Sequence, residues 1–506
     1  MSTPCLALLQ TLPESSDYVR ILPEIVLSIF GMIVMVLDSL LDEEKGPKVL
    51  GLIALGGTLS GLAATWYMST SPGLAFWRMV QVDSFSVFFH ALVIAIAGVI
   101  ILISYEYMAV QRIRAGEYYG LILFGAVGMG LMSSAIELVL IFIALEISSI
   151  SSYILAGFRR HEASSSESSL KYFLLGSFAT AFFLYGVALM FGATGSTNIA
   201  DISRSLLAAP VPVLAYAAFA LMFVGLGFKV AAAPFHVWTP DVYEGAPAPI
   251  VGLMSTAPKA AAFAVLLRVV FAINAPGRFW LIWLAAALSM TIGNLGALAQ
   301  NNVKRLLAYS SIAHAGYLLV AFAMTTREDS ATGVSAAMFY TAAYAAMNVG
   351  AFAVVGHFAN AGERYVTLED YEGLGRSSPF LAATLTVFLL SLIGIPMTGG
   401  FFAKFYVFSA ALKANLIWLT LIGVLNSAVG AYYYLRIMVV MYMRESRKDV
   451  PVTPVPFSLA AALALSVAAT IYLGVFPNQV LQYSRQSAQS LLQAPNSAVE
   501  ALSGHR

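Results

Sequence analysis

Three lysines and one glutamate lie inside long apolar stretches of this sequence. Lys229, Lys259 and Lys404 each occupy a separate stretch, and Glu146 occupies a fourth. A lysine at the middle of a lipid bilayer costs roughly 2.5–3.5 kcal/mol even on the lenient insertion scale. Ionisable side chains that persist at this depth usually face a polar interior and carry ions or protons. The pattern therefore predicts proton transfer within a membrane.

The composition predicts that most of the chain is embedded in lipid. Of its 506 residues, 59% are hydrophobic and only 10% are charged, whereas soluble domains are about 25% charged. The mean hydropathy is +0.82. Apolar runs of about 20 residues recur along the chain, and each matches one helical crossing of the hydrocarbon layer. Since isolated strands leave backbone groups unpaired in lipid and period-two alternation is absent, we expect helices.

Several functional classes are excluded by what the sequence lacks. The net charge of +1 gives no reason to expect a nucleic-acid partner. The single cysteine, Cys5, cannot by itself hold an iron–sulfur cluster or a structural zinc, or form an internal disulfide. Neither a dinucleotide-binding glycine fingerprint nor a phosphate-binding loop is present. The first nineteen residues lack the pattern of a cleaved signal peptide, so we expect the first apolar stretch to be a retained helix.

Hydropathy predicts about fourteen membrane-spanning segments. The segment at 379–411 is overlong and contains Pro396, Gly399 and Gly400, which predict a broken helix. The polar stretch 477–506 is too short and too polar for another crossing. The fourteen predicted segments are 21–41, 49–68, 84–104, 118–134, 136–157, 166–192, 211–235, 249–273, 279–300, 304–325, 333–359, 379–411, 416–443 and 456–476.

The distribution of basic residues predicts the orientation. One set of alternate loops is rich in lysine and arginine, and by the positive-inside rule this side faces the cytoplasm. With an even number of spans, both termini then lie on the outer side. The richer set of loops includes Arg159, Arg160, Lys304 and Arg305, and the poorer set includes Arg78, Arg204 and Arg278.

Proline and glycine residues mark the places where the predicted helices are disturbed. Pro234 cannot donate a backbone hydrogen bond and crowds the carbonyl of Val230, so the helix that carries Lys229 should break there. His236 follows Lys229 by seven residues, about two turns along one face of a continuous helix. We therefore expect the lysine, a freed carbonyl and the histidine to meet in one hydrated pocket.

The other two lysines stand beside similar disturbances. Lys259 directly follows Pro258, and Lys404 lies four residues after Gly400. A lysine near a broken helix meets unpaired carbonyls, which only a protein or water-lined interior tolerates. Both lysines are therefore predicted to face a polar interior.

Glu146 needs a cationic partner if it is to stay charged, and Lys171, one hairpin away, is the predicted one. A carboxylate favours the charged form of a lysine, so a change in its proton or partner switches the lysine between holding and releasing a proton. Lys171 also has Glu167 four residues before it, which would pair with it on a surface instead. His314 lies within a span but has no acidic residue close in sequence, so no role is assigned to it.

Each of these residues also has an alternative interpretation without proton transfer. The lysines could extend their amines to the lipid headgroups. Glu146 could form a structural hydrogen bond, and His236 could be a satisfied structural histidine. On that view the charges only hold helices together.

Three stretches carry a resemblance to a known family: Gly227 to Pro247, Leu306 to His314, and Pro396 to Lys404. They resemble the antiporter-like membrane subunits of respiratory complex I. Among these the sequence is most similar to the subunit N family of NADH-quinone oxidoreductase, called subunit 2 in mitochondria. The sister M family has a glutamate at the position of Lys404, and the sister L family adds a long lateral helix after its last core spans.

The resemblance implies an all-α polytopic membrane fold with about fourteen helices and two inverted five-helix repeats, each with a discontinuous helix. On this basis 1–506 forms one membrane domain, with N-terminal helices at 21–117, a first repeat at 118–273, a second repeat at 279–443, a last helix at 456–476 and the polar tail at 477–506. The second repeat has no acid that matches Glu146.

The resemblance also implies roles for individual residues. Glu146 and Lys171 match the ion pair of the first half-channel. Lys229 matches the lysine of the broken helix, with His236 after it. Lys259 matches the connecting lysine and Lys404 the terminal one.

The function implied is proton translocation along these side chains, driven by quinone reduction in other subunits of a bacterial plasma-membrane complex. FMN, iron–sulfur clusters and quinone are expected in those partners, including sister antiporter-like subunits, and no cofactor or metal is expected in this chain. The alternative is a subunit of a multisubunit cation/proton antiporter with a similar architecture.

Overall fold

The computed structural model describes residues 13–41, 46–111, 115–208, 210–273, 277–326, 330–359, 361–446 and 453–503. Cys5 lies outside these ranges. Each of the fourteen predicted segments contains a helix, which confirms the predicted fold class. The helices of these segments are α3 (Leu22–Asp38), α4 (Gly46–Met68), α5 (Ser84–Gln111), α6 (Ala115–Ser134), α7 (Leu138–Ala156), α8 (Ala163–Thr194), α10 (Val213–Val230), α12 (Ala248–Ala272), α13 (Arg278–Leu298), α14 (Val303–Thr325), α15 (Ser330–Phe358), α17 (Pro379–Ile393) with α18 (Gly399–Lys413), α19 (Ile417–Met443) and α20 (Phe457–Val475).

Shorter elements cover the two ends of this bundle. A small antiparallel hairpin, in which Gly73 pairs with Val82, departs from the all-α prediction. The predicted polar tail is largely one helix, α21 (Pro477–Ser503). The remaining short elements are α2 (Ser15–Arg20), β1 (Gly73–Ala75), β2 (Val80–Val82), α9 (Ile199–Ala208), α11 (Trp238–Gly245), η1 (Ala361–Glu363), η2 (Leu368–Tyr371) and α16 (Leu374–Ser377).

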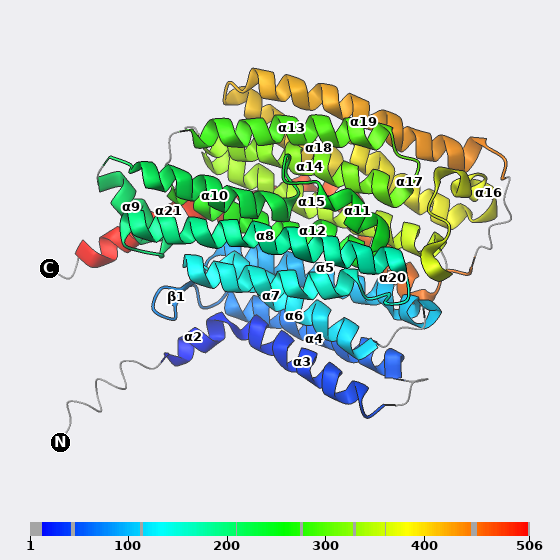
Figure 1. The fold of residues 1–506 in the computed structure, drawn as a ribbon, viewed down its shortest axis with the longest axis horizontal. Helices are drawn as coiled ribbons and strands as arrows, with labels where there is room; N and C mark the ends of the chain where they lie inside the picture. Colours follow the sequence, from blue (N-terminus) through cyan, green and yellow to red (C-terminus); the bar gives the residue numbers. More distant parts are fainter. Residues whose placement is uncertain are drawn as a thin grey trace.

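The long helices run between two ends of the molecule, which we name after the elements found there. The hairpin end carries β1, β2, α2, α9 and α21, and lies to the left in Figure 1. The α16 end carries η1, η2 and α16 and lies to the right. The first and last described segments both lie at the hairpin end, as an even number of crossings requires.

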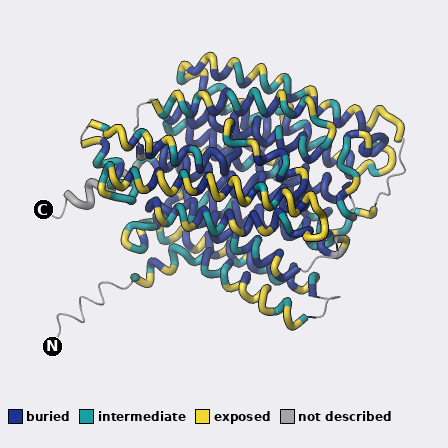
Figure 2. The backbone as a smooth tube through the Cα atoms, viewed as in Figure 1, coloured by how far each residue is buried: buried dark blue, intermediate teal, exposed yellow. Residues whose placement is uncertain are grey.

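The helices differ in whether they face the interior or the surroundings. Twelve helices among the described residues are long and apolar enough to cross a membrane, while α3 has 17 residues and α17 and α18 have 15 each. Every residue in the most apolar stretch of α12 is buried, whereas only 39% of that stretch is buried in α8. Figure 2 shows the buried residues concentrated in the middle of the bundle. Exposed apolar side chains such as Leu174 and Phe178 on α8 face outward, as lipid requires.

Four exposed tryptophans mark the level of the membrane surface at the hairpin end. They belong to the end of α4, to the hairpin, and to the starts of α13 and α19. Tryptophan is enriched where hydrocarbon meets headgroups. The four residues, with their exposed fractions, are Trp66 (76%), Trp77 (64%), Trp280 (66%) and Trp418 (73%).

Two groups of five segments have opposite directions. The first group, α6 to α12, begins at the α16 end, and the second group, α13 to α19, begins at the hairpin end. In each group the fourth segment is broken: α10 is followed by α11, and α17 by α18. This topology is the one expected for two inverted repeats.

Candidate functional site

The first break follows Val230, as Pro234 predicts. Ala231 ends α10 in the left-handed region, with a φ of 59°. The irregular backbone finds partners inside the protein: the Ala233 amide donates to Ser289 Oγ at 2.7 Å, and the Trp238 indole donates to the Phe228 carbonyl at 3.0 Å. Because these groups are satisfied, the chain can be non-helical at membrane depth.

Lys229 is buried at this break between a hydroxyl group and two aromatic rings. It is 3% exposed, and its Nζ donates to Ser149 Oγ on α7 at 2.9 Å. The amine also lies 5.9 and 5.8 Å from the ring centres of Tyr153 and Tyr172, within the range of cation–π attraction. Glu146, one turn before Ser149 on the same helix, interacts electrostatically with this amine. The first half therefore brings a lysine, a hydroxyl and a carboxyl group together.

The predicted pairing of Glu146 with Lys171 is wrong. Lys171 Nζ lies 2.7 Å from Glu167 and 2.9 Å from Asp241, and its side chain is 41% exposed. The alternative of a surface pair with Glu167 is thus confirmed. Lys171 ties α8 to α11, while Glu146 interacts electrostatically with Lys229, and its Oε1 has no hydrogen-bond partner within the described residues. The physical reason is that two other acids hold the Lys171 amine, Glu167 one turn before it on α8 and Asp241 on α11.

His236 does not meet Lys229 in a shared pocket. It is only partly buried in the segment between α10 and α11, next to Val237, which is 62% exposed. Among the described residues, no hydrogen bond joins His236 to Lys229. The spacing of seven residues puts two side chains on one face only in a continuous helix, and the left-handed Ala231 lies between them.

Lys259 occupies the middle of the most buried helix. It is the twelfth of the 25 residues of α12, which continues through Pro258. Its Nζ donates to Ser311 Oγ at 2.6 Å and lies 3.3 Å from the Ser311 carbonyl. Tyr344 donates to the same Ser311 hydroxyl at 2.8 Å. A cavity of about 10 Å³ adjoins these groups, which is close to the smallest space that a water molecule occupies.

His314 lies between the second and third lysines, a position that sequence analysis left without a role. Electrostatic interactions reach it from both Lys259 and Lys404. Its Nδ1 lies 2.7 Å from the Tyr340 hydroxyl and its Nε2 lies 3.3 Å from the Tyr434 hydroxyl. The signal in the sequence is its spacing of three residues from Ser311, which places both on one face of α14.

The second break follows Ile393, and Gly394 ends α17 with a φ of 94°. Gly400, the second residue of α18, donates its amide to Ser391 Oγ at 3.1 Å. This confirms the break predicted from Pro396, Gly399 and Gly400.

Lys404 binds the end of the broken helix itself. Its Nζ donates to the carbonyls of Leu392 and Ile393 and to Ser427 Oγ, each at 2.9 Å. The amine also lies 5.1 Å from the ring centre of Tyr317. The last carbonyls of a helix carry partial negative charge, so α17 supplies what the missing acid would supply in the second half.

The three lysines are buried deep in the protein, with exposed fractions of 3% for Lys229, 3% for Lys259 and 8% for Lys404. The alternative in which they extend to the lipid headgroups is therefore wrong. Each amine has oxygen partners, and hydroxyl groups that can both donate and accept stand beside each. We call Lys229, Lys259 and Lys404, together with these hydroxyl groups, the lysine row. Side chains of these types can hold and pass protons. Among the described residues, no group of three or more His, Cys, Asp or Glu side chains is placed to hold a metal ion.

Comparison with known proteins places this geometry in a family. The family model described as NADH:quinone oxidoreductase/Mrp antiporter, TM matches residues 135–430. NADH-quinone oxidoreductase subunit N 2 of Koribacter versatilis is 67% identical over 484 residues, which cover 94% of this chain and 98% of that protein.

Two solved structures of membrane complexes contain chains that are similar to this one. A chain of respiratory complex I from Thermus thermophilus is 37% identical, with a TM-score of 0.78 and coverage of 91% of this chain and 98% of that one. A chain of the Mrp complex from Dietzia is 21% identical, with a TM-score of 0.81 and coverage of 93% and 97%. The likeness to the Mrp chain shows a common fold.

Proposed function

The chain belongs to the NADH:quinone oxidoreductase/Mrp antiporter family, and from this premise we propose that it is subunit N of a proton-pumping NADH-quinone oxidoreductase. Its role is to move protons, or the charge that accompanies them, through the membrane. The 67% identity to a subunit N over nearly the whole of both chains favours this over the antiporter alternative.

The observation that carries the proposal is the burial of Lys229, Lys259 and Lys404 in polar surroundings, with Glu146 beside the first of them. Burying a charge without partners is expensive, and three unused lysines would cost the fold stability without return. A hydroxyl group at each amine allows a proton to be received and given back.

The mechanism follows from the pairing of Glu146 with Lys229. When Glu146 is ionised, its charge favours a protonated Lys229; when Glu146 is neutralised or turned away, Lys229 is favoured to release its proton. Ser311 and His314 then connect Lys259 to the surroundings of Lys404. Each charge moved against 100 mV requires about 2.3 kcal/mol, which quinone reduction in other subunits supplies.

Lys171 and His236 lie outside the lysine row. Lys171 and Arg305 both bind Asp241, at 2.9 and 2.7 Å, and so hold α11, the short helix that follows the first break. His236 lies at the break and is only partly buried. We assign both residues to positioning the first half rather than to carrying its proton.

The partners and the location follow from the same premise. FMN, iron–sulfur clusters and quinone are held by other subunits, and sister antiporter-like subunits adjoin this chain in a bacterial plasma membrane. The α16 end holds the richer set of basic residues, with Arg159 and Arg160 between α7 and α8 and Arg305 at the start of α14. By the positive-inside rule the α16 end faces the cytoplasm and the hairpin end, with both termini, faces outward.

The test is proton pumping by the whole complex reconstituted in liposomes, measured per NADH oxidised. Lys229→Ala and Glu146→Gln should each lower the number of protons moved per NADH while the complex still assembles. Lys413→Ala, an exposed lysine on the same helix as Lys404, is the matched control and should leave the ratio unchanged. Normal pumping by an assembled Lys229→Ala complex would refute the proposal.

A further inference from the structure

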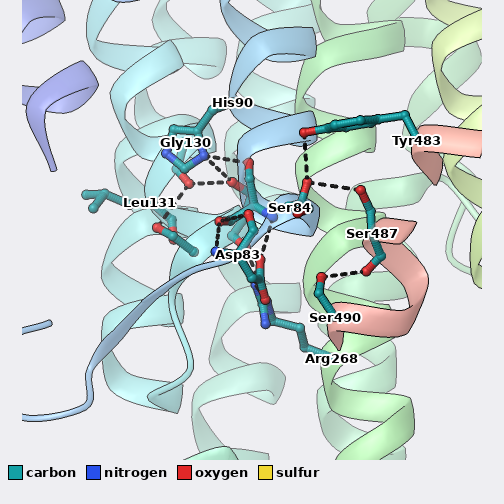
Figure 3. Close-up of polar contacts among 12 residues, drawn as sticks. Asp83, Ser84, His90, Gly130, Leu131, Arg268, Tyr483, Ser487 and Ser490 are labelled. Carbon is teal, nitrogen blue, oxygen red and sulfur yellow. Dashed lines mark hydrogen bonds and ion pairs between the residues drawn. The ribbon is translucent and has the colours of Figure 1, made fainter. Parts of the chain in front are cut away.

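A second group of buried ionisable side chains lies at the hairpin end, away from the lysine row. Figure 3 shows His90 of α5 close to the backbone of α6, with Arg268 of α12 and Asp83 below it. His90 is 1% exposed, Glu24 of α3 is 6% exposed, and Arg268 is 3% exposed. The lysine row makes no use of these residues, so their burial needs its own explanation.

The hydrogen bonds of His90 fix where its protons lie. Its Nδ1 lies 2.8 Å from the Ser86 carbonyl and 2.9 Å from Ser133 Oγ. The Ser86 carbonyl can only accept, and the Ser133 hydroxyl already donates to the Gly130 carbonyl at 2.7 Å. Both therefore accept from Nδ1, which must carry a hydrogen. The other nitrogen, Nε2, lies 2.7 Å from Glu24 Oε1.

One exchangeable proton consequently sits between His90 and Glu24. With the proton on Nε2 the pair is an imidazolium and a carboxylate, and with the proton on Oε1 it is a neutral imidazole and a carboxylic acid. The second carboxylate oxygen of Glu24 is buried and makes no hydrogen bond within the described residues. That oxygen is free to take a second proton.

The charges around the pair leave it electrically balanced. Arg268 lies 3.2 Å from both carboxylate oxygens of Asp83, and these two charges cancel. Arg268 Nε also donates to the Ser133 carbonyl at 3.1 Å, so α12 and His90 share Ser133 as a neighbour. Tyr483 of α21 donates to the Ser84 carbonyl at 3.5 Å and interacts electrostatically with Asp83. The proton on Glu24 and His90 therefore decides the net charge of the cluster.

The position of the pair suits exchange with the outer side. Glu24 is the third residue of α3 and His90 the seventh of α5, so His90 lies about 9 Å along α5 from the hairpin end. Lys259 lies nine residues before Arg268 on α12, about 14 Å deeper.

Two glycines of α6 allow close packing against the helices that carry this pair and against α7, which carries Glu146. A Cβ on Gly130 would lie 3.0 Å from Glu24 Oε1. A Cβ on Gly128 would lie 2.7 Å from the Ser148 amide of α7, the helix that carries Glu146. The absence of side chains at these two positions keeps α3, α5 and α7 close around α6.

We propose that Glu24 and His90 form a proton-binding site that releases protons from the lysine row to the outer side. This inference rests on the proposed function. Loading adds one proton to the Glu24 carboxylate beside the His90 imidazolium, which gives a carboxylic acid and a net charge of +1. Release to water at the hairpin end restores the neutral pair, and only O–H and N–H bonds form or break.

The test uses the whole complex in liposomes with Glu24→Gln and His90→Gln, which keep polar groups of similar size but cannot exchange this proton. The protons moved per NADH should fall to the level of Lys229→Ala in both variants. Glu137→Gln is the matched control, because Glu137 is also a buried acid at the hairpin end but caps α7 through the Leu140 amide at 2.7 Å. Its ratio should equal that of the parent complex.

The readout is normalised to NADH oxidised by assembled complex, so reduced assembly does not mask the result. If both variants keep the parent ratio while Lys229→Ala loses it, the proton site is refuted and the proposed function stands. If Lys229→Ala also keeps the parent ratio, the proposed function fails and this inference fails with it. A lowered ratio in Glu137→Gln as well would overturn the specific role of Glu24 and His90.

Discussion

The two broken helices hold their lysines by different means. At the first break, Lys229 has one hydrogen-bond acceptor within the described residues, Ser149, and Glu146 interacts with it electrostatically. At the second, Lys404 has three acceptors, two of which are the terminal carbonyls of α17, Leu392 and Ile393. Within the described residues, no acidic side chain pairs with Lys404.

This difference separates a partner that can change its charge from one that cannot. A carboxyl group gains or loses a proton, so Glu146 can switch the state of Lys229. The partial charges of a helix end are fixed by the backbone. We infer that the first half is the half that can be switched, and that the second half receives or delivers protons against a constant background.

The largest contrast is expected from adding one methyl group at each break. In Gly400→Ala the new Cβ would collide with the Ser391 carbonyl, a backbone atom that cannot move aside. In Gly227→Ala it would lie 2.8 Å from the Phe235 ring, which can rotate. Overpacking costs about 1–3 kcal/mol when side chains adjust, so Gly227→Ala should assemble with a lowered melting temperature. Gly400→Ala should fail to assemble, as measured by the subunit content of purified membranes.

Replacing each lysine by methionine sharpens the comparison. Lys404→Met leaves the buried Leu392 carbonyl, at about 1–3 kcal/mol, and the partly buried Ile393 carbonyl without this donor. It should lower the thermal stability of the complex more than Lys229→Met does. Adding Glu146→Gln to Lys229→Met should recover stability, because the uncompensated carboxylate is removed, with a coupling of roughly 0.5–3 kcal/mol. Strictly additive effects in this double-mutant cycle would contradict the pairing of Glu146 with Lys229.

Removing the hydroxyl group beside each lysine should have a smaller effect than replacing the lysine itself. Ser149→Ala takes away the one acceptor that the described part of the chain offers Lys229, whereas Ser427→Ala leaves Lys404 with two carbonyls. A hydrogen bond to a charged group contributes about 1.5–3 kcal/mol. Ser149→Ala should therefore lower proton pumping per NADH more than Ser427→Ala does. The opposite order would show that the carbonyls of α17 do not hold Lys404 by themselves.

The smallest expected effect near neutral pH is on stability, and it comes from an ionic contact between the two halves. Glu363 lies 2.6 Å from Lys304 of the second half and 3.5 Å from Arg159 of the first. Burial alone would raise the pKa of Glu363, but these two cations outweigh it and hold the pKa below its ordinary value of 4.5. Because the pKa is lowered in the folded state, the stabilisation is complete above pH 4.5 and is lost as the pH falls through the folded-state pKa.

Melting temperatures measured between pH 7 and pH 3 should show this dependence. The contribution of Glu363 should be constant from pH 7 to about pH 5 and decline below pH 4.5, and Glu363→Gln should lack that part of the decline. An unchanged acid limb in the variant would exclude Glu363 as a cause.

Much of this architecture could be predicted from the sequence because its causes are local. A run of about 20 apolar residues needs no partner to define a span, and each of the fourteen segments predicted in this way contains a helix. Pro234 and the run from Pro396 to Gly400 predict breaks because missing donors and flexible backbone act within one helical turn. The burial of Lys229, Lys259 and Lys404 follows from their depth in the apolar stretches.

The partners of these side chains were decided by tertiary structure alone. Glu146 interacts with Lys229 rather than Lys171 because the Lys171 amine is held by Glu167 and by Asp241 of α11. His236 turns away from Lys229 because Ala231 adopts a left-handed conformation between them. The carbonyls around Lys404 and the pairing of Glu24 with His90 join segments that are separate in the sequence. Hydropathy predicts how deep in the membrane a residue lies, but only the packing of the helices determines which neighbour its side chain contacts.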